Sequence, residues 1–254
     1  MEHGVARVWT AGVVIIGDEI LSGRTQDRNV AQIGRWLNVQ GIRLAEVRVV
    51  PDVEERIIGA LDALRNAFDY CFTTGGIGPT HDDITVDAVA RALGVEVVIH
   101  PRARAILERY YEGRGGLNEG RLRMARVPRG AELIENRMSG APGIRIGNLV
   151  LMAGVPHITA GMLDALTGTL EGGRPLVSRT IGGFVPESEV AELLLAAEKA
   201  NDGVAIGSYP FFREGKVGSN FVIRSEDQAL AEQVASELAE ALAAAGFETV
   251  AGGV

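Results

Sequence analysis

The chain has 254 residues, of which 46% are hydrophobic and 23% charged, close to the average for soluble globular proteins. This composition excludes a disordered polymer, and the length fits one large domain or two smaller ones. The 25 basic and 33 acidic side chains give a net charge of −8, which argues against binding to nucleic acid or to an anionic membrane. No apolar stretch has the length of a transmembrane helix, so we expect a cytoplasmic protein with no membrane partner.

The first two-thirds of the chain alternate short apolar runs with amphipathic segments. The apolar runs predict strands at residues 11–16, 42–50, 70–74 and 95–99. Apolar residues at helical spacing predict helices at 29–40, 53–67 and 83–93, and Pro101 suits the first position of another helix. This alternation is typical of α/β proteins with a mostly parallel sheet and helices on both faces.

The pattern loosens after residue 111, where residues 112–120 form a glycine-rich loop. Strands follow at 131–134 and 144–152, and a helix at about 157–170. The Gly-Gly-Arg-Pro sequence at 172–175 predicts a linker. We therefore divide the chain into domains at 1–170 and 171–254.

The second domain is markedly acidic, with 13 acidic and 6 basic side chains in residues 171–254. Its pattern predicts a small α+β unit with strands at 176–184, 204–209 and 216–224 and helices at 186–200 and 227–245. We expect turns at 207–210 and 214–215.

Acidic residues follow the first two predicted strands. Asp18 and Glu19 come after Gly17, and Asp52 comes after Pro51. Ligands of open parallel sheets bind beyond the carboxyl ends of the strands, so these side chains are candidates for a site. Solvated turns and helix N-caps are the alternative interpretations, and an N-cap is the simplest one for Asp52.

A glycine-rich segment follows the third predicted strand and leads into a helix. Glycines allow backbone N–H groups to approach a phosphate, and a helix N-terminus favours anions. The aspartates in the same segment would repel a bare phosphate. A divalent cation between the carboxylates and the phosphate would remove this repulsion. A glycine turn with one capping aspartate is the simpler alternative. The candidate residues of this segment are Thr74, Gly75, Gly76, Gly78, Thr80, Asp82 and Asp83.

Two further glycine segments, 140–143 and 154–157, each resemble ordinary turns when taken alone. They provide Gly143 and Gly154 as weaker candidates for contact with a ligand. Cys71 is the only cysteine and lies in a predicted strand, so it excludes an intramolecular disulfide and is expected to pack in the core.

Together these motifs resemble the molybdopterin-binding (MogA/MoaB-like) superfamily, and most closely its CinA-like branch. The resemblance rests on the Thr-Gly-Gly-x-Gly-Pro-Thr-x-Asp-Asp-x-Thr sequence at 74–85 and on Gly-Asp-Glu-Ile-Leu at 17–21. It implies a three-layer α/β/α domain followed by a small KH-like domain, and a homo-oligomer, either a dimer or a trimer. Ala153 and the Ser139-Gly140 pair depart from the pattern of the branch, which leaves the substrate open.

The resemblance implies that Asp52 and Asp83 carry the chemistry of the site. In the CinA-like branch the implied reaction is metal-dependent hydrolysis of an adenine dinucleotide pyrophosphate such as ADP-ribose or FAD. Asp18, Glu19, Asp82 and Asp83 would hold Mg²⁺, Mn²⁺ or Co²⁺, with K⁺ as a further candidate. The alternatives are a molybdopterin-binding protein or molybdopterin adenylyltransferase, and a non-catalytic nucleotide-binding module. Deamidation by full-length CinA proteins belongs to a carboxy-terminal domain outside the region of this resemblance, so we do not expect that activity from these residues.

Overall fold

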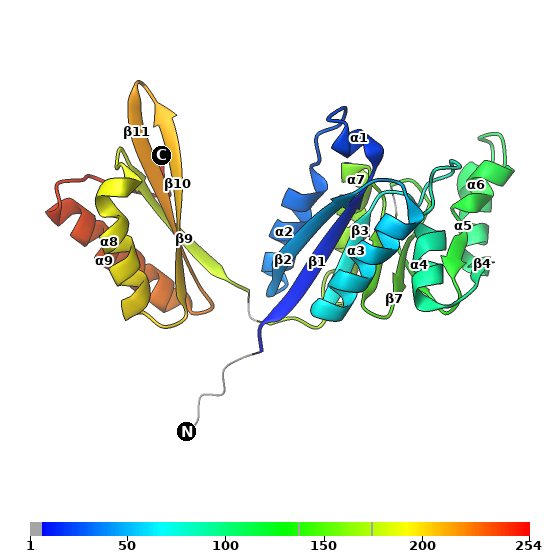
Figure 1. Cartoon of the computed structure of the whole chain (residues 1–254), viewed down its shortest axis with the longest axis horizontal. Helices are drawn as coiled ribbons and strands as arrows, with labels where there is room; N and C mark the ends of the chain where they lie inside the picture. Colours follow the sequence, from blue (N-terminus) through cyan, green and yellow to red (C-terminus); the bar gives the residue numbers. More distant parts are fainter. Residues whose placement is uncertain (1–6, 137, 174) are drawn as a thin grey trace. The chain divides into compact units, whose positions relative to one another are not determined.

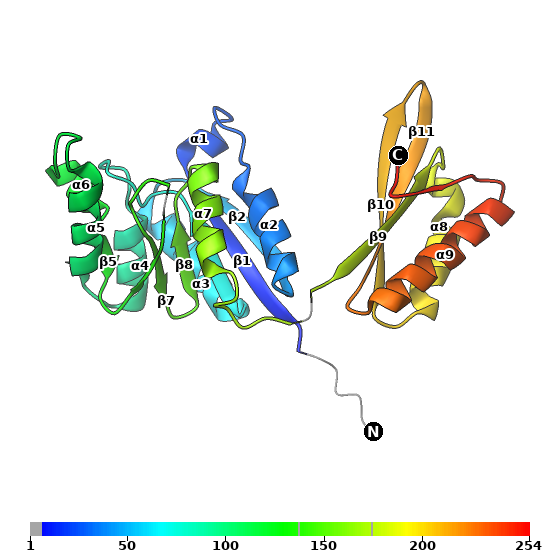
Figure 2. The ribbon, with the colours of Figure 1, turned by 180° about the vertical axis from the view of Figure 1, so that it is seen from behind.

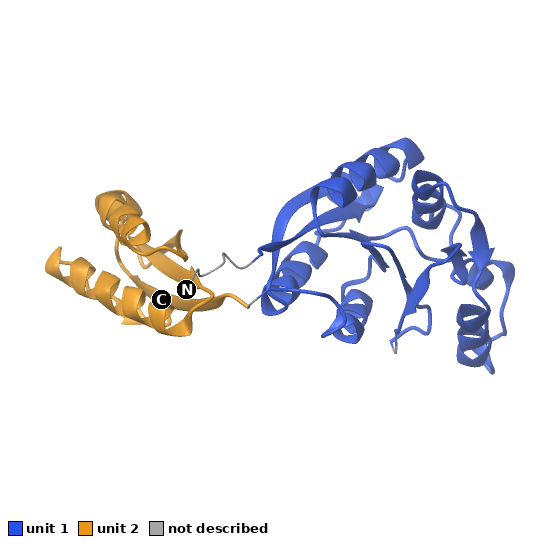
Figure 3. Cartoon of the chain, turned by 90° about the horizontal axis from the view of Figure 1, so that it is seen from below, with its two compact units in different colours: residues 1–173 blue, residues 174–254 orange. Residues whose placement is uncertain are grey.

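The computed structural model describes residues 7–136, 138–173 and 175–254. The chain divides into two compact units between residues 173 and 174, three residues beyond the boundary that we placed from the sequence. Figure 3 distinguishes the two units by colour. None of the described helices is both long and apolar enough to cross a membrane.

A mixed, mostly parallel sheet forms the centre of the first unit, as predicted (Figure 1). Its strands in spatial order are β2 (Ile42–Val50), β1 (Trp9–Ile16), β3 (Tyr70–Thr74), β8 (Leu149–Met152), β7 (Gly143–Ile146) and β6 (Glu132–Ile134). The first four strands run parallel, whereas β7 is antiparallel to both of its neighbours. The near-continuous apolar sequences of β1, β3 and β8 follow from burial on both faces, whereas the edge strand β2 alternates buried or half-buried with exposed residues.

Helices cover both faces of this sheet, which gives three layers (Figure 2). On one face α2 (Asn29–Val39) and α7 (Pro156–Leu166) pack over Val13 and Ile15 of β1. On the other face α3 (Glu54–Ala67) and α4 (Thr85–Leu93) pack over Val14 and Ile16. Alternate side chains of one strand point to opposite faces, so β1 contributes to both cores.

Two strand predictions in this unit need correction. The strand predicted at 95–99 is the shorter β4 (Val97–Ile99), which pairs with β5 (Arg126–Pro128) outside the main sheet. The sheet position beside β3 belongs instead to β8. The apolar run 144–152 is a hairpin of β7 and β8 because Gly147, with a φ of 57°, allows a turn inside it. Short helices α5 (Pro101–Tyr111) and α6 (Glu119–Arg123) lie in the segment between β4 and β5.

The second unit is a small antiparallel sheet with two helices. Its strands lie in the order β10 (Val204–Arg213), β11 (Lys216–Ser225), β9 (Val177–Gly183) and β12 (Val250–Ala251). Side chains of α8 (Glu187–Ala200) and α9 (Gln228–Ala244) pack with Phe221 and Ile223 in one core. The turn predicted at 207–210 is wrong, since these residues continue β10 and pair with β11. Pro210 is tolerated there because β10 is an edge strand.

Candidate functional site

The carboxyl ends of β1, β2 and β3 meet at one edge of the main sheet. Strand β1 lies between β2 and β3, so the chain leaves β1 to one side and returns on the other. Such a reversal of strand order opens a crevice outside the strand ends. A cleft of about 570 Å³ lies there. The predicted residues that line it are Glu19, Asp52, Gly75, Gly76, Gly78, Asp82, Asp83 and Gly154.

The glycines of the loop after β3 are required by close backbone contacts. A Cβ atom on Gly75 would lie 2.2 Å from the carbonyl oxygen of Ile16, and φ at Gly75 is 99°. A Cβ atom on Gly76 would lie 2.1 Å from Oγ1 of Thr85. The Thr85 hydroxyl donates to the Gly75 carbonyl at 2.9 Å, and its N–H donates to the Gly76 carbonyl at 3.0 Å. The start of α4 therefore holds the glycine loop against β1.

Asp83 does not cap α4, which corrects the simpler interpretation of its segment. The helix begins at Thr85 and its N-cap position is Ile84. The Asp83 carboxylate instead accepts the backbone N–H of Thr80 at 2.7 Å and also the Thr80 hydroxyl. A side chain on Gly78 would meet this carboxylate, since its Cβ would lie 2.7 Å from Oδ2. Asp83 therefore closes the loop that lines the cleft.

Asp82 is an exposed acidic residue of the same loop. The nearby Thr80 hydroxyl lowers the pKa of Asp82 below its ordinary value, and the positive charges of His81 and Arg123 contribute. This side chain is therefore ionised at neutral pH.

Asp52 does not cap the helix that follows it, because Val53 is the N-cap residue of α3. Its carboxylate accepts the backbone N–H of Asp18 at 2.9 Å, which ties the end of β2 to the one-turn helix α1 (Asp18–Leu21). Partial burial raises the pKa of Asp52, and the negative charges of Glu19, Asp18 and Asp82 raise it further. A carboxylate with a raised pKa is a better proton acceptor near neutral pH.

The remaining candidates differ in their access to the cleft. Gly154 lines it, and the buried Asn29 side chain donates to its carbonyl at 2.7 Å. Gly143 is the buried first residue of β7, where a Cβ would lie 3.0 Å from the Leu151 carbonyl oxygen. Asp18 and Thr80 act through the hydrogen bonds to Asp52 and Asp83. Thr74 is 1% exposed, and its hydroxyl has no hydrogen-bond partner among the described residues.

The acidic residues of the cleft fit a metal ion that is shared with a ligand. Within the described residues, no three Asp, Glu, His or Cys side chains come together to form a metal site of their own. Mg²⁺ in nucleotide-binding proteins is commonly held by one or two carboxylates together with phosphate oxygens and water. The carboxylates of Glu19, Asp52 and Asp82 line a cleft in which such an ion would meet a phosphate.

Sequence reasoning missed the wall of the cleft that α5 and α6 supply. Tyr111 and Met124 line the cleft, although the sequence contains no local signal for this. The Arg121 guanidinium lies 4.1 Å from the centroid of the Tyr111 ring, and the Tyr110 ring packs edge-on against Tyr111. These contacts fix the aromatic side chain at the edge of the cleft.

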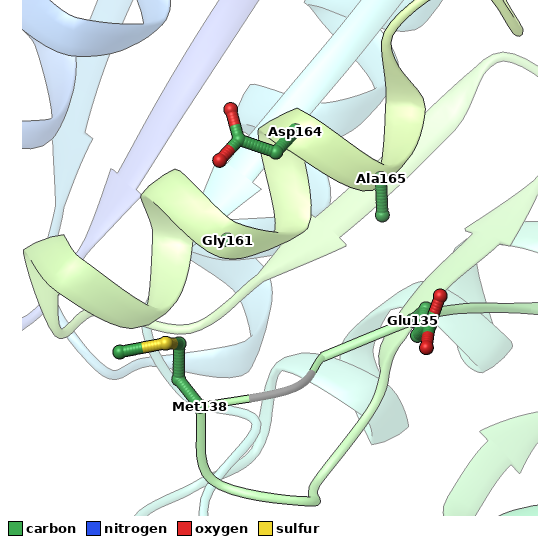
Figure 4. Close-up of a pocket in the computed structure, with 5 residues that line it drawn as sticks. All are labelled: Glu135, Met138, Gly161, Asp164 and Ala165. Carbon is green, nitrogen blue, oxygen red and sulfur yellow. The ribbon is translucent and has the colours of Figure 1, made fainter.

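A second hollow, of about 300 Å³, lies between α7 and the segment after β6 (Figure 4). Glu135 and Met138 line it from that segment, and Gly161, Asp164 and Ala165 line it from α7. None of these residues belongs to the glycine loop or to the exits of β1, β2 and β3. The cleft at the strand exits is therefore the better candidate site.

Comparison with known proteins agrees with this arrangement. Residues 12–172 match the family model described as "Probable molybdopterin binding domain", and residues 175–250 match "FAD synthase, middle domain". The chain belongs to the molybdopterin-binding domain family, and its relatives place it among the CinA-like members.

Three relatives illustrate the range of the family. A protein of Aeropyrum pernix is 35% identical over 94% of this chain and 90% of its own length. A CinA-like protein of Citrifermentans bemidjiense is 35% identical over 91% of this chain, but the match spans only 58% of that protein. A probable FAD synthase of Caenorhabditis elegans is 30% identical over 92% of this chain and 50% of its own length.

Among solved structures, a CinA protein of unknown function from Thermoplasma acidophilum superimposes with a TM-score of 0.60. The two sequences are 33% identical, and the match covers 64% of this chain and 98% of the Thermoplasma chain.

Proposed function

We propose that this protein hydrolyses the pyrophosphate of an adenine dinucleotide, such as ADP-ribose or FAD, with the help of a divalent metal ion. The observation that carries the proposal is the Asp52 carboxylate, which lines the same cleft as the glycine loop and has a raised pKa. Membership of the molybdopterin-binding family supports a small nucleotide-like ligand. Similarity to the probable FAD synthase makes FAD a natural substrate to test.

In the proposed reaction the backbone N–H groups of residues 76–78 bind the pyrophosphate and stabilise its developing charge, since the N–H of Gly75 already donates to the Met152 carbonyl at 3.2 Å. Asp52 accepts a proton from the attacking water. The new bond joins the water oxygen to the adenylate phosphorus, and the bond from that phosphorus to the bridging oxygen breaks. The products are AMP and the phosphate monoester of the other half. A divalent ion held by Glu19, Asp82 and Asp83 beside Asp18 would neutralise the phosphate charge.

Release of AMP tests this proposal directly. Purified protein is incubated with ADP-ribose, FAD and NADH, each with Mg²⁺, Mn²⁺ or Co²⁺, with and without K⁺, and with EDTA as the control. The proposal predicts AMP from at least one dinucleotide, and none in EDTA. Release of AMP at the same rate in EDTA would refute the role of the metal.

Adenylyl transfer to molybdopterin is the second candidate, and the family match over residues 12–172 favours it. The same cleft would hold the nucleotide and the pterin. Transfer of adenylate from ATP to molybdopterin, with no AMP from any dinucleotide, would replace the first proposal by this one. Binding of nucleotide without either reaction would leave a non-catalytic module. The dimer or trimer expected from the resemblance remains a prediction, which light scattering would test.

A further inference from the structure

Arg123 is a charged residue beside the cleft that the proposed reaction does not use. It is the last residue of α6 and is half-buried. Its Nη2 atom donates to the carbonyl oxygen of Asp83 at 3.3 Å, and Asp83 lines the cleft. The next residue in the chain, Met124, lines the cleft as well. Arg123 does not itself line the cleft but lies directly behind Asp83 of the loop that does.

The guanidinium of Arg123 has a buried donor that the protein does not satisfy. Its Nε atom is buried and has no hydrogen-bond partner among the described residues. An arginine stays charged and offers five N–H donors, and leaving one of them buried without an acceptor is costly. Such a group calls for an explanation, and an acceptor supplied by a ligand is one.

The other arginine of α6 provides an internal comparison. Arg121 donates from Nη1 to the carbonyl oxygens of Arg114 and Gly116, and it covers the ring of Tyr111. Its guanidinium therefore has a structural task within its own segment. Arg123 makes one long hydrogen bond to the loop that lines the cleft, and its charge acts on Asp82 there.

We propose that the Arg123 guanidinium turns toward the nucleotide in this cleft and binds one of its phosphate oxygens, which gives the Nε–H that lacks a partner here an acceptor. The planar fork of a guanidinium matches the geometry of phosphate oxygens. Glu19, Asp52, Asp82 and Asp83 are the charged residues that line the cleft, so a cation from beside it offsets their repulsion of phosphate. The proposal rests on the proposed function only in that it places nucleotide phosphates at this loop.

Titration calorimetry with ADP and with adenosine, both in Mg²⁺, tests this contact without requiring turnover. Arg123→Met removes the donors, and Arg123→Lys keeps the charge without the fork. Hydrogen bonds to charged groups are strong, so we expect Arg123→Met to weaken ADP binding by about tenfold or more. Adenosine binding should stay unchanged, and Arg123→Lys should lie between. Arg104→Gln, on an arginine that pairs with Glu108 along α5, is the matched control and should bind ADP like the wild type.

Thermal unfolding separates this role from a structural one. We expect ligand-free Arg123→Met to keep or raise its Tm, because it loses an unsatisfied buried donor. The rise in Tm on adding ADP should shrink. A lower Tm with equal losses for ADP and adenosine would make Arg123 a clamp on the loop and overturn the proposal. Unchanged ADP binding, or a wild type that binds neither ADP nor inorganic pyrophosphate, would overturn it as well. Selective loss of ADP binding without AMP release from any dinucleotide would refute the hydrolase and leave this contact standing.

Discussion

Two glycine-rich segments border the same cleft but use their glycines differently. In the loop after β3, Gly75 and Gly76 have positive φ, and a side chain on either would strike β1 or α4. In the segment 140–143, which leads into β7, Gly140 also has a positive φ of 73° but makes room for the ring of Tyr110, and Gly143 packs against the Leu151 carbonyl. The first set of glycines shapes the backbone that lines the cleft, whereas the second allows close packing. The number of glycines in a segment is therefore a poor guide to a ligand site. The atoms that a Cβ would contact at each glycine are a better one.

The largest expected loss of activity comes from substituting Asp52, which lines the cleft together with the loop after β3. We expect Asp52→Asn to reduce AMP release by about 10²- to 10⁴-fold, the usual contribution of a general base. The matched control is Asp62→Asn, on an aspartate that pairs with Arg65 along α3. Steady-state rates with ADP-ribose and FAD measure both. If Asp52→Asn retains the wild-type rate, Asp52 is not the general base.

The glycines give the most direct comparison of the two segments. Gly76→Ala forces a side chain against Thr85 at a φ of 68°, so we expect nucleotide binding to be lost and stability to fall by about 1–3 kcal/mol. Gly143→Ala meets the Leu151 carbonyl at 3.0 Å and should also destabilise the fold. It should nevertheless leave the nucleotide Kd of the folded protein close to wild type. Calorimetric Kd values and urea unfolding check both variants, and an equal effect on Kd would erase the distinction.

The titration of Asp52 in metal-free protein sharpens its role. Because its pKa is raised, the Asp52 carboxyl should titrate at a higher pH than that of an ordinary aspartate. Glu19→Gln removes a negative charge that raises this pKa, so it should move the titration to lower pH. Glu46→Gln, which removes the partner of Arg48 on β2, should leave the titration in place. NMR of the carboxyl carbon without added metal measures the shift, and a shift in the opposite direction would contradict the assignment.

The same pKa shift has a consequence for stability with a definite sign. A carboxyl whose pKa is raised by folding contributes stability only while it is protonated, and this is lost as the pH rises through the folded pKa. Asp52→Asn keeps an oxygen for the N–H of Asp18 and removes the charge. Relative to wild type, its Tm should therefore rise as the pH increases from 4 to about 7. A Tm difference that shrinks over this range would contradict the shift.

The smallest expected effect concerns Asn29, which supports the part of the cleft that follows β8. Asn29→Ala leaves the Gly154 carbonyl without its 2.7 Å hydrogen bond, and we expect it to cost about 1–2 kcal/mol of stability. Because Gly154 lines the cleft, KM should rise a few-fold while kcat changes little. Urea unfolding and steady-state kinetics measure the two effects separately. A fall in kcat with unchanged KM would show that Asn29 affects the chemical step and not the binding of substrate.

The sequence predicts the parallel part of the fold well because its signals are local. The predicted strands at 42–50 and 70–74 coincide with β2 and β3, whose apolar runs are bounded by polar residues and turns. Gly94, in the left-handed conformation, ends α4 where the pattern places the end of that helix. The pairing of β4 with β5 escapes such reasoning, because it depends on contacts between segments about thirty residues apart.

The candidate site likewise has a part that the sequence predicts and a part that depends on contacts between distant segments. The Thr-Gly-Gly segment after β3 is continuous in sequence, so its pattern predicts a loop at a strand exit, and that loop lines the cleft. Asp52 looks like a helix cap in sequence, and only the fold brings the N–H of Asp18 to its carboxylate. Tyr111 and Arg123 come near the cleft through the packing of α5 and α6, for which no local pattern exists.

A crystal structure of the Asp52→Asn variant with ADP-ribose and Mg²⁺ tests the central claim most directly, because the slowed variant should retain its ligand. The account predicts the pyrophosphate against the backbone of residues 76–78, with Mg²⁺ between the phosphates and the carboxylates of Glu19 and Asp82. A ligand in the hollow between Glu135 and Asp164, or in the second unit, would contradict it.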